Sequence, residues 1–186
     1  MHRPSRSSPR RLPRLASGLA AVCLSAGLAS GADYYAARNG SNTDTPPYDS
    51  WGNAASNIQA AVDVAAVSDT VWVGPGTYTL PANPTNHYGI NVVYIGRPMT
   101  LRGSTGNPAD VLIDGEDSYR PLIVRITTGT SKPVVLDGLT FCNGRAATYG
   151  GGILLADLGS WEGYKTIVQN CIVRDNTVAY SSGAYG

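Results

Sequence analysis

Four acidic side chains lie within eight positions of the sequence and could together bind a metal ion. They are Asp110, Asp114, Glu116 and Asp117. Carboxylate oxygens are ligands that Ca²⁺ prefers, so calcium is the one cofactor that the sequence suggests. However, Asp114 precedes Gly115 as Asp137 precedes Gly138, and this recurrence favours a role for Asp114 in a repeated turn.

Two aromatic side chains in a polar segment could contact carbohydrate. They are Trp161 and Tyr164, in the stretch Asp157-Leu-Gly-Ser-Trp-Glu-Gly-Tyr164. Loops on a rigid scaffold often carry binding residues, and aromatic rings offer flat apolar faces to sugars. The alternative is that both rings fold back over the neighbouring strands.

No motif places a catalytic base or nucleophile. His87 is the only histidine after the first 32 residues, and no motif fixes Arg125 or Arg145. The glycine-rich stretch Gly144–Leu155, GRAATYGGGILL, lacks the lysine of a phosphate-binding loop, and a strand rather than a helix follows it. We therefore predict no catalytic residue, and we interpret the glycines as a corner before a strand.

The first 32 residues have the layout of a secretory signal peptide. They combine an apolar run over Leu15–Leu28 with five arginines and no acid, and cleavage is expected after Gly31 or Ala32. The apolar run is too short to span a bilayer. Arg10-Arg11 and Cys23 leave twin-arginine export and lipidation as alternatives, which Pro13 and Val22 disfavour. We predict a secreted or cell-surface protein.

Removal of this segment would leave an acidic chain. Nine basic and 13 acidic residues remain, for a net charge near −4. Such a chain has no basic stripe that could release counterions from nucleic acid. Nucleic acid is thereby excluded as an expected partner.

The elements that must position these side chains are short strands after one helix. Residues 33–80 are predicted as an N-terminal cap with an amphipathic helix over Ser56–Val67, capped by Ser56, and a strand over Thr70–Val73. Gly74-Pro-Gly76 then forms a turn. Residues 81–186 read as strands between turn residues, over Ile90–Ile95, Thr100–Arg102, Val111–Asp114, Leu122–Thr127, Val134–Phe141, Gly152–Ala156 and Thr166–Arg174.

These strands align with one another at intervals of 32 to 35 residues. Thr100–Gly103 matches Val135–Gly138 at 35, and Leu136–Asn143 matches Val168–Asp175 at 32. Such a period is the mark of a solenoid. Gly138 aligns with Asn170, and these residue types tolerate positive φ, so a left-handed corner is expected there. Cys142 falls on the opposite parity to Cys171, so no disulfide should join them.

We therefore predict an all-β fold, a right-handed parallel β-helix whose N-terminal helix covers the edge of the first coil. The coils would be incomplete at Gly186, as in the N-terminal part of a longer protein. An antiparallel sandwich or jelly roll is the alternative.

Three phrases in the chain resemble secreted right-handed β-helix proteins of the pectate-lyase-like superfamily. They are Tyr34-Tyr-Ala-Ala-Arg-Asn-Gly40, Asn57-Ile-Gln-Ala-Ala-Val62 and Asp69-Thr-Val-Trp-Val-Gly-Pro-Gly-Thr-Tyr78. The resemblance implies a cap helix and a first coil. Gly150-Gly-Gly-Ile153 and Leu139-Thr-Phe-Cys-Asn-Gly144 are also similar to repeats of polymorphic outer-membrane proteins, although Val173-Arg-Asp-Asn176 lacks their phenylalanine.

The resemblance also implies possible chemistry. Pectate lyases bind calcium through aspartates and use an arginine as a base, whereas pectin hydrolases begin their signature with the trio found here as Asn42-Thr-Asp44. The paired aspartates and Gly-His-Gly of the hydrolases are missing. We expect an adhesin-like or polysaccharide-binding protein without catalysis in this segment, its partner an extracellular polysaccharide or cell-surface glycan. The alternative is a polysaccharide lyase or hydrolase with active residues beyond Gly186.

Overall fold

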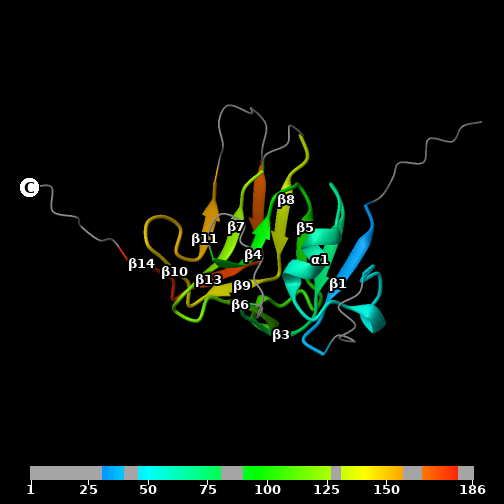
Figure 1. The fold of residues 1–186 in the computed structure, drawn as a ribbon, viewed down its shortest axis with the longest axis horizontal. Helices are drawn as coiled ribbons and strands as arrows, with labels where there is room; N and C mark the ends of the chain where they lie inside the picture. Colours follow the sequence, from blue (N-terminus) through cyan, green and yellow to red (C-terminus); the bar gives the residue numbers. More distant parts are fainter. Residues whose placement is uncertain (1–30, 40–45, 81–89, 127–130, 157–164, 180–186) are drawn as a thin grey trace, which may run out of the picture.

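The protein is built mainly of short parallel strands. A computed structural model describes residues 31–39, 46–80, 90–126, 131–156 and 165–179, and these contain fourteen strands, one α-helix and two 3-10 helices. Every strand pairing within this part of the chain is parallel. The all-β prediction is confirmed, with parallel rather than antiparallel sheets (Figure 1).

The strands form three main sheets, which the chain enters in turn. Sheet A contains β1 (Asp33–Ala36), β2 (Thr70–Val73), β5 (Thr100–Gly103), β8 (Val134–Asp137) and β12 (Thr166–Gln169), in that order. Sheet B contains β3 (Gly76–Tyr78), β6 (Val111–Asp114), β9 (Thr140–Cys142) and β13 (Ile172–Arg174). Sheet C contains β4 (Asn91–Ile95), β7 (Arg120–Val124) and β11 (Ile153–Leu155), and β10 (Arg145–Ala146) pairs with β14 (Thr177–Val178).

The register of the sheets agrees with the offsets predicted from the sequence. Thr100 pairs with Val135, 35 residues later, and Leu136 pairs with Val168, 32 residues later. Phe141 and Val173 pair at the same offset of 32 in sheet B. Residues matched in the sequence therefore lie one strand apart in space.

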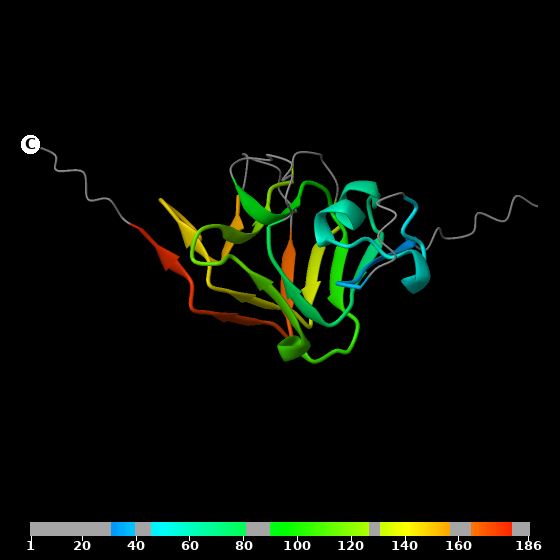
Figure 2. The ribbon, with the colours of Figure 1, turned by 60° about the horizontal axis from the view of Figure 1, so that its bottom comes forward.

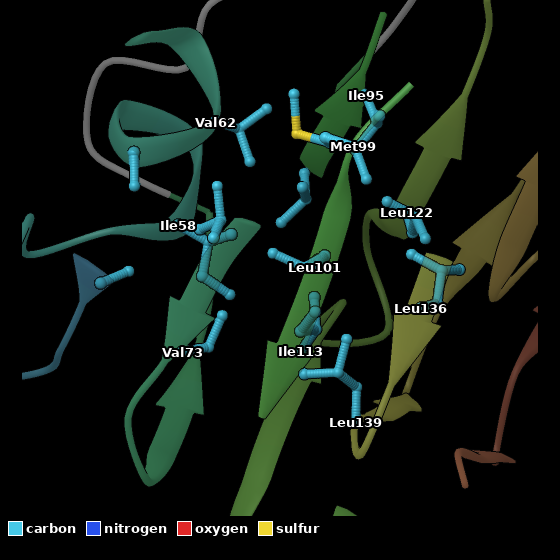
Figure 3. Packing of buried hydrophobic residues seen from close by; sticks show 14 of the residues in the cluster. Ile58, Val62, Val73, Ile95, Met99, Leu101, Ile113, Leu122, Leu136 and Leu139 are labelled. Atoms are coloured by element: carbon cyan, nitrogen blue, oxygen red, sulfur yellow. The ribbon is translucent and has the colours of Figure 1, made fainter. Parts of the chain in front are cut away.

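Inward side chains from successive strands stack into columns that make up the core. In sheet A the buried column is Val71, Leu101 and Leu136, and in sheet B it is Tyr78, Ile113 and Phe141. Figure 3 shows Leu101, Ile113 and Leu122 pointing from different strands into one interior. Burial of these apolar surfaces is the main source of stability in such a fold.

Left-handed corner residues break two of the predicted strands. Gly138 has a φ of 67° and separates β8 from β9, so the predicted strand over Val134–Phe141 is wrong in its continuity. Asn170, with a φ of 49°, separates β12 from β13 in the same way. The predicted left-handed corner is thereby confirmed at both positions, and the strands end there because positive φ is incompatible with an extended ladder.

The helix α1 (Ile58–Val64) is shorter than predicted and has a different cap. The Asn57 side chain accepts a hydrogen bond from the Ala60 amide at 2.9 Å, so Asn57 and not Ser56 is the N-cap. Ala55 holds the preceding chain extended, because it forms a parallel bridge with Ala36. The helix ends at Val64 because Ala65 is already extended, with ψ 139°.

The helix packs at one end of the molecule, beside the first strands of sheets A and C. It contacts β1, β2 and β4. The buried Gln59 side chain forms hydrogen bonds with the backbone of Tyr94 in β4, the edge strand of sheet C at this end. Its Oε1 accepts from the Tyr94 amide at 2.7 Å, and its Nε2 donates to the Tyr94 carbonyl at 3.2 Å. The last strand, β14, lies at the opposite end (Figures 1 and 2).

Strands β2 and β6 have the predicted bounds, whereas β4, β5, β7 and β11 differ from the prediction by one to three residues at their ends. β7 begins at Arg120, two residues early, and ends at Val124, whereas β11 lacks Gly152 and Ala156. The short strands β1, β3, β10 and β14 were not predicted. Within the described residues, no helix reaches the length and hydrophobicity needed to cross a membrane.

Candidate functional site

A hollow of about 290 Å³ lies where the end of β1, the 3-10 helix η1 (Trp51–Asn53) and the turn between β2 and β3 meet. It is lined by Ala37, Arg38, Asn39, Trp51, Gly74, Pro75 and Ser104. Ser104 comes from the next layer, since its amide donates to the Val73 carbonyl at 2.9 Å. Four segments that are distant in the sequence thus form one site.

Trp51 supplies an aromatic wall to this hollow. Its ring meets the Tyr35 ring edge to face, with ring centroids 4.7 Å apart. A Cβ added to Gly74 would lie only 3.3 Å from the Trp51 ring, so the absence of a side chain there lets the indole lie close to the turn. The Trp51 residue is 46% exposed and retains accessible ring surface beside the hollow.

Arg38 brings a positive charge to the same hollow. Its aliphatic stem lies over Gly76, where an added Cβ would come within 2.7 Å of the Arg38 Cγ. Gly76 has a φ of 140°, so a side chain there would also be strained. The two glycines of Gly74-Pro-Gly76 therefore make room for the indole and the guanidinium stem on either side of Pro75.

The buried Tyr78 hydroxyl contacts the backbone of Gly74, which lines the hollow, and of Ala36, which precedes the lining residue Ala37. It donates to the Gly74 carbonyl at 2.8 Å and lies 3.4 Å from the Ala36 carbonyl. Burial raises the pKa of Tyr78 to about 12, although a hydrogen bond from the Arg38 backbone and the Arg38 charge act in the opposite direction. The hydroxyl thus remains a donor at neutral pH and ties the end of β1 to the turn after β2.

The described side chains of the lining are of kinds that can bind a ligand. An indole surface is accompanied by the Arg38 guanidinium, the Asn39 amide and the Ser104 hydroxyl, and among the described residues that line the hollow none carries a carboxylate, imidazole or thiol. Ligand pockets are commonly lined by aromatic side chains with a few polar groups placed around them.

A row of polar side chains crosses the outer surface of sheet A beyond Tyr35. The Arg102 guanidinium lies 5.4 Å from the centroid of the Trp72 ring and 3.1 Å from the Asp137 carboxylate, which also accepts from Gln169. The Trp72 indole donates to Asp33 at 3.0 Å. These groups satisfy one another across neighbouring strands, so the row serves sheet pairing rather than ligand binding.

The four acidic residues suggested for calcium make local contacts. Both Asp114 carboxylate oxygens accept from the Asn143 amide, at 3.1 and 3.0 Å, and one also accepts from the Glu116 backbone at 2.8 Å. Asp110 accepts from Asn107 at 3.1 Å. Glu116 and Asp117 are exposed and both have a φ of 52°, in a tight turn.

Within the described ranges, no three His, Cys, Asp or Glu side chains come together in a way that could hold a metal ion. The contacts of Asp114 match the turn that the sequence offered as the other interpretation. Calcium at Asp110, Asp114, Glu116 and Asp117 therefore has no assembled site to support it.

The two thiols are free, as the sequence register predicted. Cys142 is buried and pairs across the ladder with Arg174, whereas Cys171 is half-buried and its Sγ contacts the Gln169 carbonyl at 3.1 Å. Burial raises the pKa of both thiols above the ordinary value. Neither thiol lines the hollow.

Two predicted carbohydrate contacts, and other residues that were weighed as candidates for catalysis, lie outside the described residues. They are Trp161 and Tyr164, His87, and the trio Asn42-Thr-Asp44. Of the two unplaced arginines, Arg125 follows β7 and donates its amide to the Ile95 carbonyl, and Arg145 lies exposed in β10. The sequence had marked Gly74-Pro-Gly76 only as a turn, and nothing in it linked that turn to Arg38 and Trp51.

No family model, curated protein or solved structure matches the chain.

Proposed function

We propose that the protein is a secreted or cell-surface right-handed parallel β-helix that binds polysaccharide at the hollow beside Trp51. The fold is supported by the order in which the chain enters the three sheets and by the pairing offsets of 32 and 35 residues. In this interpretation α1 and Gln59 cover the first coil. Each later strand then pairs with its equivalent one coil earlier.

The observation that carries the binding proposal is the accessible indole of Trp51 beside three polar side chains. A pyranose has an apolar face and a rim of hydroxyl groups, so it can lie on an indole while its hydroxyls reach neighbouring polar groups. The guanidinium of Arg38, the amide of Asn39 and the hydroxyl of Ser104 are such groups. No reaction is assigned to this site, which suits an adhesin-like role.

The proposed location follows from the leader. Its arginines, apolar run and small residues before Asp33 direct export, and the acidic chain that remains suits an extracellular protein that meets polysaccharides or cell-surface glycans. Trp161 and Tyr164 stay predicted as further carbohydrate contacts.

The test is a glycan-binding screen followed by titration of the best ligand into the protein without its leader. Trp51→Ala is expected to weaken binding about ten-fold, because the loss of one stacking platform costs roughly 1.4 kcal/mol. Trp51→Phe should restore part of the affinity, since it returns an aromatic face.

Tyr149→Ala is the matched control, because Tyr149 is an exposed aromatic residue (71%) that does not line the hollow. It should bind as the unchanged protein does. Equal affinity of Trp51→Ala and the unchanged protein, with circular dichroism spectra that show both folded, would remove the hollow as the binding site. Absence of binding to every polysaccharide in the screen would contradict the proposed function.

A further inference from the structure

Two asparagines in the chain are followed directly by glycine. They are Asn39, which lines the hollow beside Arg38, and Asn143, which lies at the corner after β9. An asparagine in this position can lose its side-chain amide without an enzyme, because a following glycine has no Cβ to hinder attack by its backbone nitrogen. Residue type alone makes the two sites equal, so the fold decides which of them can react.

The reaction requires the asparagine side chain and the next peptide nitrogen to meet. The glycine nitrogen attacks the side-chain carbonyl carbon and gives up its proton, and the Nδ2 group leaves as ammonia, so that a cyclic imide closes. Water then adds to one of the two imide carbonyls and breaks its bond to nitrogen, which leaves an aspartate or an isoaspartate. One water is consumed and one ammonia is released, and nothing is oxidised or reduced.

Hydrogen bonds fix every group of Asn143 and Gly144 that this reaction uses. The Asn143 Nδ2 donates to both Asp114 carboxylate oxygens, at 3.1 and 3.0 Å. The attacking nitrogen is also engaged, because the Gly144 amide donates to the Asn176 Oδ1 at 2.7 Å. On the other side of the same peptide bond, the Asn143 carbonyl accepts from the Asp117 amide at 2.7 Å. Attack at Asn143 therefore requires these contacts to break first.

Packing around Gly144 strengthens this restraint. A Cβ added at Gly144 would come within 2.2 Å of the Gly151 carbonyl oxygen and 2.5 Å of the Pro121 Cδ, so the backbone has little room to move. The Asn176 side chain that holds the Gly144 amide is itself anchored, because its Nδ2 donates to the Phe141 carbonyl at 3.0 Å. The corner after β9 thus keeps the two reacting groups in place.

The surroundings of Asn39 differ from those of Asn143. Arg38 and Asn39 are both exposed, in the turn after β1. Within the part of the chain that the structure describes, no hydrogen bond holds the Asn39 side chain. Gly40 lies outside that part and enters the comparison through its residue type alone. The restraints that protect Asn143 therefore have no counterpart on the side chain of Asn39.

We propose that Asn39 is a site of spontaneous deamidation and that the fold protects Asn143 from the same reaction. The product has a carboxylate in the lining of the hollow beside Arg38, whose guanidinium has no ion-pair partner among the described residues. The new carboxylate can pair with this guanidinium. The reaction is independent of the proposed function, whereas its effect on glycan binding rests on it, because a paired Arg38 offers fewer hydrogen bonds to a sugar.

The test is peptide mapping by mass spectrometry after incubation of the protein for several days in mildly alkaline buffer. In the folded protein, the peptide that contains Asn39 should convert to the acid at least about ten-fold faster than the peptide that contains Asn143, because opening a hydrogen bond to a carboxylate costs about that factor. In guanidinium chloride the two rates should converge, since both asparagines precede glycine and the restraints are lost.

Two variants separate the two sites. Gly40→Ala should slow the conversion of Asn39 and leave Asn143 unchanged, because the added methyl group hinders the attacking nitrogen. Asp114→Ala should accelerate the conversion of Asn143 and leave Asn39 unchanged, since it releases the Asn143 amide; circular dichroism establishes that this variant is folded. The comparison of the folded with the denatured protein does not depend on either variant.

Two results would overturn the proposal. Equal rates at Asn39 and Asn143 in the folded protein would show that the corner after β9 gives no protection. An Asn39 that stays intact in the folded protein and reacts only in guanidinium chloride would show that the fold protects this residue as well. Neither measurement uses a ligand, so its failure is distinguishable from a failure of the glycan-binding screen.

Discussion

The Asp69 carboxylate lies 2.8 Å from the backbone nitrogen of Ala32 and accepts a hydrogen bond from it across 37 positions of sequence. Its other oxygen accepts from the Ala66 amide at 2.6 Å, and the carboxylate is buried. The Ala32 carbonyl in turn accepts from the Thr70 amide at 2.9 Å. One side chain thus sets the starting register of β1 against β2 and closes the turn after α1.

Replacement of Asp69 should therefore destabilise the fold. Asp69→Ala would leave two amides without their acceptor, and we expect the free energy of unfolding to fall by about 2 kcal/mol. Urea denaturation followed by circular dichroism measures the change. Asp49→Ala, which removes an exposed carboxylate from a residue without a left-handed backbone, should shift it by less than about 0.5 kcal/mol. Equal effects of the two substitutions would contradict the role given to Asp69.

The same contact favours one of the two predicted cleavage positions of the proposed leader. Cleavage after Gly31 would make Ala32 the first residue and place its charged amino group beside Asp69, which strengthens the hydrogen bond. Cleavage after Ala32 would remove both the donor to Asp69 and the acceptor for Thr70. Amino-terminal sequencing of the exported protein should begin with Ala32, and a sequence that begins with Asp33 would show the second position.

The two thiols should differ in reactivity. A thiol reagent is expected to modify Cys171 before Cys142 in the folded protein, because Cys142 is fully buried. Since burial raises the pKa of both, modification should be slower than for free cysteine at neutral pH and should accelerate as the pH rises. Mass spectrometry of the labelled peptides gives the order. A peptide linked through Cys142 and Cys171 would contradict both the register and the structure.

Ionisation of the Tyr78 hydroxyl should lower the stability of the fold at alkaline pH. Its pKa is about 12 in the folded protein, whereas an unfolded tyrosine titrates near 10, so the unfolded state loses the proton first. The contribution of Tyr78 to stability is therefore complete below about pH 10 and is lost as the pH rises toward 12. Tyr78→Phe should lower stability at neutral pH through the lost hydrogen bonds, and the difference from the unchanged protein should shrink across this window. A constant difference would contradict the assignment.

The strands and their register could be predicted because the signal is local and recurs. Gly138 and Asn170 mark the corner, and alternate apolar residues such as Leu139 and Phe141 mark the inner face. The same pattern did not show that the corner would interrupt the strand. It also missed β1, since Tyr34-Tyr-Ala-Ala has no alternation and its strand character comes from pairing with β2.

The cap of α1 and the hollow depended on contacts that no local pattern contains. Ser56 and Asn57 are both good caps by residue type, and the bridge between Ala55 and Ala36 decides between them. The hollow requires Arg38 and Trp51 to meet on either side of Gly74-Pro-Gly76, which follows only from the position of β1 beside β2. The signals present in the sequence were a tryptophan shortly before the helix and the two glycines of the turn.

The first edges of sheets A and C and the last strands of the sheets also differ in the time at which they are synthesised. Residues 48–59, which occupy the first edges of sheets A and C, leave the ribosome before the later strands, and each of those strands adds to the edge exposed by the one before. Folding by such addition can follow the direction of synthesis, because every strand from β5 onward except β10, which pairs with the later β14, finds its parallel neighbour already present. The position of the covering segments near the amino terminus therefore gives the chain a built-in order of assembly.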